Sequence, residues 1–433
     1  MTIRICHHYF QTLFMKHSDL EGKKILIVGY GKEGKTTKAY LESVLSHPNI
    51  AVVDAKDGPQ YLDAQHEFDI AIRSPSVHPS KLTIPTTTAT NIFFANCENM
   101  IIGVTGSKGK STSTSLIHHF LSHAGKDARL VGNIGTPALS ELLKPYSPET
   151  IFVMELSSYQ LMDCVYSPHI AVVTTLFPEH MNFHGSVEKY YEAKKHIIIH
   201  QAVEDYYIFN PQFTQLMQWV KETQATSIPE KKFDVDMQLT PLKGEHNLHN
   251  IRLALTACEI LGIDAKQAMT HLGTFQPLPH RLEFIGTYHD IDFYDDAIST
   301  TPESTMAALN TLQFVGTLFL GGEDRGYDFR TLVKELHVLE IGAIVLFPDS
   351  GTKIKELIEK EEGYNPRMLV TDSMHDAVAF AYEHTPQGSI CLLSTASPSY
   401  SIWKNFEEKG DMFAEEVKRL GSKTNNEKFT TNN

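Results

Sequence analysis

Cysteine is scarce in this sequence, and the few cysteines show no pairing pattern. Five occur in 433 residues, an odd number, and no two of them are spaced as Cys-x-x-Cys. Disulfide frameworks need paired cysteines and zinc knuckles need closely spaced ones, so neither is expected. Scattered thiols are typical of reduced cysteines in a cytoplasmic protein, which is the location that we expect.

Long apolar runs are also missing. No stretch approaches the roughly 18 apolar residues that a membrane-spanning helix needs, so no membrane span is expected. The first fifteen residues, MTIRICHHYFQTLFM, mix His, Arg and Gln with apolar side chains, unlike the apolar core of a signal peptide. We interpret the start, 1–19, as a disordered arm or a misassigned translation start, and the polar ending, 421–433, as a frayed tail.

Basic residues are outnumbered by acidic ones. The chain has 38 Lys and Arg against 52 Asp and Glu, which gives a formal net charge of -14. A phosphate backbone attracts clustered Lys and Arg, so nucleic acid is not expected as a partner. With 42% hydrophobic residues the chain has the composition of a globular protein, and its length favours two to four domains.

Apolar strands alternate with helical segments along the chain, which predicts an α/β fold. From 24 to 54 a strand, a glycine turn, a helix and a second strand form a βαβ start, and a similar pattern begins at 101. The prolines of QPLPHRLEF predict a linker before the last parallel strands. We expect three domains: a Rossmann-like domain at 1–97, a central P-loop domain with a parallel sheet at 98–278, and a Rossmann-like domain at 279–433.

The segment GVTGSKGKST, 103–112, has the residues of a phosphate cradle between a strand and a helix. Glycines let backbone amides approach phosphate oxygens, and the helix N-terminus adds partial positive charge. We expect Lys110 to reach the outer phosphates and the hydroxyl of Ser111 or Thr112 to meet Mg²⁺. The position five before Gly109 is Val104, so the spacing departs from the standard P-loop pattern, and an ordinary glycine-rich turn is the alternative.

Another glycine loop, the first in chain order, lies near the start of the chain. Gly29, Gly31 and Gly34 follow the first strand, and Asp54 ends the next strand. This is the spacing of a dinucleotide fingerprint, in which the acidic residue binds a ribose. The pattern fits NAD, a UDP-sugar or a loop without a ligand.

Two more side chains are expected at the ligand-binding edge of the central sheet. Glu155 ends the strand IFVME, and His180 follows the strand AVVTTL, so both emerge where parallel α/β sheets bind ligands. Glu155 is a candidate Mg²⁺ ligand, whereas His180 taken alone is better explained as a structural histidine. In the helical stretch YYEAKKHI, the residues themselves predict only a solvated face for Lys194 and Lys195.

The motifs stand in the order found in the Mur ligases, and the chain resembles that family over about 24–420. The segments that carry the resemblance are GVTGSKGKST, GNIGTPALSELL, ELSSYQL, PEHMNFHGS, YYEAKKHI, GEHNLHN, PHRLE, GGEDRGYDF and KNFEEKGDMF. Within the family, the chain is most similar to the glutamate-adding members. The resemblance implies a first domain for UDP, a central ATPase and a last domain that brings the amino acid.

It also implies an ADP-forming amide ligase of peptidoglycan precursor synthesis. ATP would phosphorylate the alanine carboxylate of UDP-N-acetylmuramoyl-L-alanine, and the amine of glutamate would attack the acyl phosphate. A carboxylate is a poor acyl donor until phosphate makes a better leaving group. Mg²⁺ and Lys110 would offset the crowded negative charge.

The resemblance assigns roles to individual residues. Lys194 matches the lysine that the family carbamylates with CO₂, which would turn a cation into a source of anionic oxygens for Mg²⁺. Asn133 would contact the muramyl part of a substrate whose UDP lies at the first glycine loop. The expected metal ligands are Ser111, Glu155, His180 and Lys194. The residues expected to bind ATP are Gly106, Ser107, Lys108, Gly109, Lys110, Ser111, Thr112, Asn247, Asn250, Arg281 and Asp296.

The glutamate site departs from the family pattern at one position. Where the D-glutamate enzymes read roughly NDSKATN, this chain reads DDAISTTP, so Ile298 replaces a lysine. The loss of this cation and the STTP continuation resemble the branch that adds L-glutamate. Thr300, Ser399 and Phe406 match the family's contacts with glutamate. We therefore expect glutamate as the substrate and favour its L form.

Three alternatives remain open. A sister ligase, such as a folylpolyglutamate synthase or another Mur step, shares the P-loop and the carbamylated lysine. An NAD-dependent oxidoreductase would use Asp54, but it leaves Glu155 and His180 unexplained. A catalytically silent nucleotide-binding regulator would not need Lys110 and Lys194.

Overall fold

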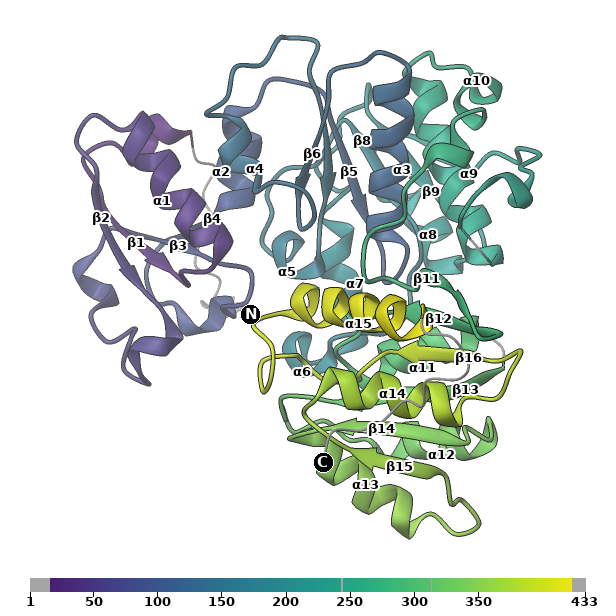
Figure 1. Cartoon of the computed structure of the whole chain (residues 1–433). Coiled ribbons are helices and arrows are strands. Elements are labelled where there is room, and N and C mark those ends of the chain that lie inside the picture. Colours follow the sequence, from purple (N-terminus) through teal and green to yellow (C-terminus); the bar gives the residue numbers. More distant parts are fainter. Residues whose placement is uncertain (1–15, 243, 313, 423–433) are drawn as a thin grey trace, which may run out of the picture. The chain divides into compact units, whose positions relative to one another are not determined.

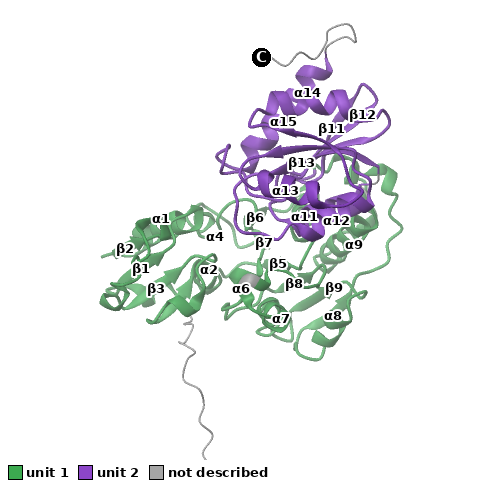
Figure 2. Ribbon diagram, turned by 90° about the horizontal axis from the view of Figure 1, so that it is seen from below, with its two compact units in different colours: residues 1–276 green, residues 277–433 purple. Residues whose placement is uncertain are grey.

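The computed structural model describes residues 16–242, 244–312 and 314–422, which fall into two compact units, 1–276 and 277–433 (Figure 2). Residues 1–15 of the expected arm and 423–433 of the expected tail lie outside the described residues. The end of the arm forms a short 3-10 helix, His17–Leu20, in which Leu20 is buried. Disorder was therefore the wrong expectation for that part.

The predicted α/β architecture is confirmed, because strands and helices alternate through both units (Figure 1). The strands of unit 1 are β1 (Lys24–Val28), β2 (Asn49–Val53), β3 (Ile70–Arg73), β4 (Thr86–Thr88), β5 (Ile101–Thr105), β6 (Ala128–Gly132), β7 (Ile151–Glu155), β8 (Ile170–Val173), β9 (Tyr206–Phe209) and β10 (Thr226–Pro229). Those of unit 2 are β11 (Glu283–Tyr288), β12 (Ile291–Asp295), β13 (Val315–Gly321), β14 (Ala343–Phe347), β15 (Arg367–Val370) and β16 (Ile390–Leu393).

The helices cover these sheets. In unit 1 they are α1 (Lys32–Val44), α2 (Ala89–Asn96), α3 (Lys110–His123), α4 (Ala138–Glu141), α5 (Ser158–Leu161), α6 (Met181–His184), α7 (Val187–Lys195), α8 (Thr214–Trp219), α9 (Glu245–Ile260) and α10 (Ala265–Met269). In unit 2 they are α11 (Pro302–Thr311), α12 (Arg330–Val338), α13 (Ser350–Lys360), α14 (Met374–His384) and α15 (Phe406–Gly421). No helix in the described ranges combines the length and the apolar character that crossing a membrane requires.

The first sheet of unit 1 is parallel throughout, in the order β2-β1-β3-β4. Its central strand β1 is apolar without a break because both of its faces are covered. Ile25 belongs to the apolar cluster that extends to the second sheet, whereas Leu26 and Val28 belong to a separate cluster on this sheet.

The second sheet of unit 1 is also parallel, in the order β10-β9-β8-β5-β7-β6. The chain enters it at β5, builds β6 and β7 on one side, and then crosses to build β8 to β10 on the other. Ligands of open α/β sheets bind at the carboxyl ends of the strands where the order reverses in this way. The structure therefore places the second glycine loop, at the end of β5, in the position where a ligand is expected.

An ion pair joins the two sheets of unit 1. Arg73, at the end of β3, donates from Nη2 to Oδ1 of Asp163 at 2.6 Å and from Nε to Oδ2 at 2.8 Å. The Arg73 side chain is completely buried, and Asp163 follows α5 of the second sheet. This contact holds the first sheet against the second.

The sheet of unit 2 has the order β11-β12-β16-β13-β14-β15. All neighbours are parallel except β11 and β12, which form an antiparallel hairpin at one edge. The sequence predicted a strand-rich start to this unit but not the antiparallel pairing. The order reverses at β13, which lies between β14 and β16, so the carboxyl ends of β12, β13 and β16 meet at one edge.

Candidate functional site

The loop 106–109 joins β5 to α3 and requires glycine at both ends. Gly106 and Gly109 have φ angles of 149° and 83°. A Cβ atom at Gly106 would lie 2.0 Å from Oγ1 of Thr174, and one at Gly109 would lie 2.3 Å from Oδ1 of Asn250. The loop is thus packed against the end of β8 on one side and against α9 on the other.

Two threonines after β8 support this loop, although no sequence pattern indicated their role. The N–H groups of Ser107 and Lys108 donate to the carbonyl and the hydroxyl of Thr175, both at 2.8 Å. The hydroxyl of Thr174 donates to the carbonyl of Lys108 at 2.5 Å. Because the amides of Ser107 and Lys108 are used inside the protein, an anion would be bound by the N–H groups of the first turn of α3.

Lys110 lies across the loop. Its Nζ donates to the carbonyl of Gly106 at 3.0 Å and to that of Ser107 at 2.8 Å. The hydroxyl of Ser107 is not exposed to a ligand, since it donates to the carbonyl of Phe177 at 2.7 Å. The positive charge of Lys110 and the N-terminus of α3 therefore lie at the same loop, 106–109, where both would attract an anion.

Two asparagines of α9, both predicted to bind ATP, lie near the loop. The hydroxyl of Ser113 donates to Oδ1 of Asn250 at 3.2 Å. Nδ2 of Asn250 donates to Oδ1 of Asn247 at 3.0 Å. The amides of both residues are held at the start of α3, although they follow Lys110 by more than 130 positions in the sequence.

Glu155 ends β7, the strand next to β5, and is buried with 1% of its surface exposed. Nδ2 of Asn133 donates to its Oε1 at 2.8 Å. Its Oε2 is buried and makes no hydrogen bond within the described chain. A buried carboxylate oxygen without a donor costs free energy, and a cation would satisfy it.

Lys194 is buried on α7 with 1% of its surface exposed. Its Nζ donates to the carbonyl of Gly106 at 2.7 Å. Burial and then the nearby ammonium of Lys110 lower the pKa of Lys194 well below its ordinary value, against the opposing effect of the carboxylates of Glu179 and Glu155. The amine is thus held at the glycine loop in a setting that disfavours its charged form.

The residues alone predicted a solvated face for the adjacent Lys194 and Lys195 of α7, and this is wrong for Lys194. Its neighbour Lys195 does pair at the surface, with ion pairs of 2.8 Å to Glu192 and Glu222. The family resemblance, which singled out Lys194, was the signal that separated the two.

His180 precedes α6 and has a left-handed backbone with φ 57°. Burial lowers its pKa, Glu179 opposes this shift, and the charges of Lys110 and Lys194 add to it. Glu179 itself forms an ion pair of 3.0 Å with Lys108. His180 therefore lies within the electrostatic reach of the lysines at the loop.

The side chains assigned to the metal thus gather at the carboxyl edge of the second sheet. Lys194 is hydrogen-bonded to the loop and is coupled electrostatically to Glu155 and to His180. Glu155 and His180 do not belong to a compact set of three His, Cys, Asp or Glu ligands. The only such set within the described ranges lies in unit 2.

The first glycine loop is built differently. Asp54 accepts from the N–H of Tyr30 at 2.6 Å, and this contact with that to Lys56 lowers the pKa of Asp54. A Cβ at Gly34 would lie 2.1 Å from the carbonyl of Gly29, whereas one at Gly31 would meet nothing within 4 Å. Close packing thus requires glycine at position 34 but not at position 31.

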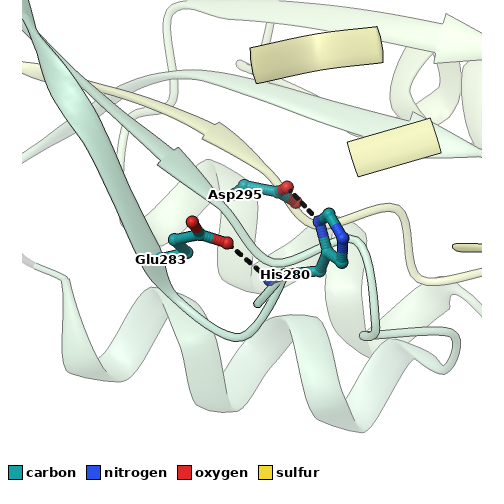
Figure 3. A group of neighbouring side chains, drawn as sticks. All are labelled: His280, Glu283 and Asp295. Carbon is teal, nitrogen blue, oxygen red and sulfur yellow. Dashed lines mark hydrogen bonds and ion pairs between the residues drawn. The ribbon is translucent and has the colours of Figure 1, made fainter. Parts of the chain in front are cut away.

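In unit 2, the neighbours of Arg281 include a hydrogen-bonded group, and Figure 3 shows its members His280, Glu283 and Asp295. Nδ1 of His280 lies 2.7 Å from Oδ2 of Asp295, and the N–H of His280 donates to Oε2 of Glu283 at 2.7 Å. Arg281 stands between two residues with left-handed φ angles, 60° at His280 and 45° at Leu282. Its Nε is buried and makes no hydrogen bond within the described chain.

The ligand atoms of His280, Glu283 and Asp295 lie within 4.8 Å of one another, which is close enough for a metal ion. However, the ring of His280 is hydrogen-bonded to Asp295, and Glu283 accepts from the backbone N–H of His280. The buried Lys409 also lies near Asp295. Burial lowers the pKa of Lys409 to about 7, while Asp295 and Asp296 oppose the shift. A hydrogen-bonded support for Arg281 explains the group better than a metal ion does.

Asp296 is buried at the carboxyl end of β12. Its Oδ2 accepts from the hydroxyl of Ser394 at 2.8 Å, and its Oδ1 accepts from the N–H of Leu282 at 3.2 Å. Burial raises the pKa of Asp296 to about 6, and the nearby Arg281 acts against this shift. Asp296 thus fixes the loop that carries Arg281.

The residues matched to glutamate all lie in unit 2. Ser399 is 2% exposed, and its Oγ is buried without a hydrogen bond in the described chain. Phe406 begins α15, with its ring centre 6.1 Å from that of His280. Thr300 and the half-buried Ile298 follow β12, and the N–H of Ile298 donates to the carbonyl of His280 at 3.2 Å.

Comparison with known proteins decides the family. Two family models match, the Mur ligase middle domain over 104–239 and the Mur ligase, glutamate ligase domain over 280–396. A UDP-N-acetylmuramoylalanine–D-glutamate ligase of Streptococcus uberis is 32% identical over 448 residues, which cover 92% of this chain and 97% of that protein. The chain belongs to the Mur ligase family.

A UDP-N-acetylmuramoyl-L-alanine–L-glutamate ligase of Salinispora tropica is 31% identical to this Mur ligase, and the match covers 93% of this chain and 99% of that protein. The structure of the UDP-N-acetylmuramate-alanine ligase MurC from Thermotoga maritima has a TM-score of 0.60 at 15% identity, covering 92% and 100% of the two chains. This likeness shows a shared three-domain fold. Mur ligases use ATP to form amide bonds, so the chain is an ATP-dependent ligase, and the oxidoreductase alternative is set aside.

Proposed function

We propose that this Mur ligase joins glutamate to UDP-N-acetylmuramoyl-L-alanine in peptidoglycan precursor synthesis, and so serves growth of the cell wall. The observation that carries the proposal is the gathering of Lys110, Glu155 and Lys194 around one glycine loop at the switch point of the second sheet. Relatives with glutamate ligase names match over more than nine tenths of the chain.

ATP would bind at the loop 106–109 and the start of α3. The N–H groups of the first turn would hold the phosphates, and Lys110 would leave the carbonyls of Gly106 and Ser107 for the outer phosphate oxygens. Asn247 and Asn250 lie near the same loop, and Arg281 and Asp296 are proposed as further residues that bind ATP. Arg281 suits this role because its buried Nε has no partner within the described chain.

The residues around the loop fit Mg²⁺. Oε2 of Glu155 is buried and lacks a donor, and hard cations take carboxylate oxygens. We propose Ser111, Glu155, His180 and a carbamylated Lys194 as its ligands. The carbamate forms when the neutral amine of Lys194 attacks CO₂ and loses a proton, and burial favours that neutral amine. Bound Mg²⁺ would neutralise charge on the transferring phosphoryl group.

The reaction has two steps. A carboxylate oxygen of the substrate alanine attacks the γ-phosphorus of ATP, and ADP leaves. The glutamate amine then attacks the carbonyl carbon of the acyl phosphate, the tetrahedral intermediate expels inorganic phosphate, and the nitrogen loses a proton. Lys110 stabilises negative charge on the phosphoryl oxygens in the first step, and Asn133 would orient the muramyl part of the substrate.

The first glycine loop and Asp54 are proposed to bind the UDP part, through Gly29, Gly31 and Gly34. The corresponding domains are 1–97 for UDP, 98–278 for ATP and 279–433 for the amino acid. Thr300, Ser399 and Phe406 are proposed to contact glutamate. We further propose that the reaction takes place in the cytoplasm, and the four cysteines of the described chain, all free and buried, are compatible with that location.

The comparisons do not distinguish D-glutamate from L-glutamate as the substrate. The preference for the L form rested on Ile298, but the comparisons include both a D-glutamate and an L-glutamate ligase at nearly equal identity. They give that preference no support. Glutamate of either form carries two carboxylates, and Ser399 offers a buried hydroxyl to either.

Phosphate release tests the proposal. The purified chain is incubated with ATP, Mg²⁺ and UDP-N-acetylmuramoyl-L-alanine, with D-glutamate, L-glutamate or no amino acid. We expect release that requires the UDP precursor and one enantiomer, and loss of about 100-fold or more in Glu155→Gln. Release with neither enantiomer would move the chain to a sister ligase, and ATP hydrolysis that ignores the precursor would contradict the proposed substrate.

A further inference from the structure

Three histidines gather at the end of α3 that lies away from Lys110. His119 and His123 are one turn apart on α3, and His271 lies between α10 and the 3-10 helix Leu272–Thr274. The ring centres of His119 and His123 are 4.1 Å apart, and those of His123 and His271 are 4.5 Å apart. At about 1.5 Å per helical residue, this group lies roughly 14 to 20 Å along α3 from Lys110.

Two of the three rings form hydrogen bonds to backbone carbonyls. Nε2 of His119 donates to the carbonyl of His271 at 2.9 Å, and Nδ1 of His123 donates to the carbonyl of His119 at 2.8 Å. In the neutral ring the opposite nitrogen then carries the lone pair. This leaves Nδ1 of His119 and Nε2 of His123 as basic atoms. Metal-binding histidines are oriented by the same kind of contact between the second ring nitrogen and a carbonyl.

We propose that His119, His123 and His271 form a binding site for a divalent transition-metal ion of the Ni²⁺, Zn²⁺ or Cu²⁺ class. Two histidines four residues apart on one helix face form a chelating pair, and a histidine from a second segment completes a three-nitrogen set. None of the three forms an ion pair with a carboxylate in the described chain. A set of imidazoles selects these metals over Mg²⁺, which takes oxygen ligands.

Metal binding requires a local change at one ring. The three rings lie in a row, with interplanar angles of 46° and 37° between neighbours, and do not converge on one point; His123, the middle ring, is exposed. To bind the metal, the exposed His123 ring would give up its hydrogen bond to the carbonyl of His119 and turn about its own side-chain bonds, which leaves the core undisturbed. His119, in contrast, packs against the ring of Phe275 at 5.4 Å and stays in place.

The proposed site has a structural consequence within unit 1. His271 belongs to the segment that leads to Gln276, where unit 1 ends. A metal ion shared with α3 would fasten this segment to the helix that begins at Lys110.

Calorimetric titration with Ni²⁺ tests the site. The full chain is stripped with a chelator and titrated at pH 7.5 with Mg²⁺ present in excess, so that oxygen-ligand sites are occupied. We expect one Ni²⁺ site of about micromolar affinity, and at least about 10-fold weaker binding in His123→Ala and in His271→Gln. Ni²⁺ should also raise the melting temperature of the wild type by a few degrees and that of His123→Ala by less.

Two controls separate this site from other histidines. His196 and His200 are also four residues apart, but their ring centres are 6.0 Å apart and nearly perpendicular, so His200→Ala should bind Ni²⁺ as the wild type does. A variant with both His7→Ala and His8→Ala, outside the described residues, should do the same. Unchanged Ni²⁺ binding in His123→Ala and His271→Gln would overturn the proposal. The outcome does not depend on the ligase reaction, because no nucleotide or UDP precursor is present.

Discussion

Arg73 and Asp163 are 90 positions apart in the sequence, yet two hydrogen bonds, of 2.6 and 2.8 Å, join the guanidinium to both carboxylate oxygens. Nη1 of Arg73 also donates to the carbonyl of Val77 at 2.9 Å, and Nη2 to that of Tyr159 at 3.2 Å. The positive charge of Arg73 is therefore neutralised by Asp163, and its N–H groups are hydrogen-bonded within the protein in place of water. This contact joins the first and second sheets together with the apolar cluster that extends from one to the other.

Removal of one partner should destabilise unit 1. In Asp163→Ala, the Arg73 guanidinium keeps its buried place but loses its counter-charge, which costs about 3 to 5 kcal/mol of unfolding free energy. Urea unfolding followed by circular dichroism measures this change. Lys38→Ala, which removes an exposed i,i+4 pair of 3.5 Å with Glu42, should cost under about 0.5 kcal/mol. Equal effects of the two substitutions would contradict the role of the buried pair.

The glycine at the start of α3 should be irreplaceable for nucleotide binding. In Gly109→Ala, the new methyl group meets the Asn250 side chain at 2.3 Å, and the backbone has φ 83°. We expect at least about 10-fold weaker binding of a fluorescent ATP analogue. Gly125, at the other end of α3, has a similar φ of 76° but nothing within 4 Å, so Gly125→Ala measures backbone strain alone. Similar ATP affinity in both variants would argue against the close contact with Asn250.

Carbamylation should be specific to one of two adjacent lysines. With ¹³C-bicarbonate, NMR should detect a carbamate carbon in the wild type and in Lys195→Ala but not in Lys194→Ala. The buried Lys194 has a lowered pKa and supplies a neutral amine, whereas the pKa of Lys195 is raised, its ion pairs with Glu192 and Glu222 outweighing burial. Phosphate release should fall about 100-fold or more in Lys194→Ala only. A carbamate signal that persists in Lys194→Ala would refute the assignment.

The stability of unit 1 should depend on the protonation of His184. Burial lowers the pKa of this ring to about 4 from an ordinary value of 6.5, and its Nε2 lies 3.0 Å from the hydroxyl of Ser158. Between pH 4 and 6.5 the unfolded chain binds more protons than the folded chain, so the unfolding free energy rises with pH in this window. It falls as the pH drops from 6.5 to 4. Urea unfolding at several pH values should show a smaller slope in His184→Gln, and an unchanged slope would exclude this histidine as a cause.

Much of the fold was predictable because parallel strands are buried on both faces and therefore read as unbroken apolar runs. The segments ILIV, IIGVT and AIVLF are β1, β5 and β14. The hairpin β11–β12 was harder to predict. β12 alternates buried and half-buried residues, and β11 has no fully buried residue, as expected of an edge strand.

The candidate site was predictable only in part. Glycine spacing located the loop 106–109, and the end of an apolar strand located Glu155. The positions of Thr174 and Thr175 depend on which strand neighbours β5, which no local pattern specifies. The burial of Lys194 and Lys409 was hidden for the same reason, because a lysine in a helical segment carries no local sign that other elements will enclose it.

The buried thiols of this chain bear on how the protein can be studied. Burial raises the pKa of Cys97 to about 11 and the pKa values of Cys164 and Cys258 to about 12, and it raises the pKa of Cys391 as well. Thiolate is the reactive form, so these four side chains are poor targets for maleimide reagents. Once Cys6 is replaced by serine, a cysteine introduced at the exposed position of Ser46 would take up a fluorescent dye selectively, so that nucleotide-dependent movements can be followed one molecule at a time.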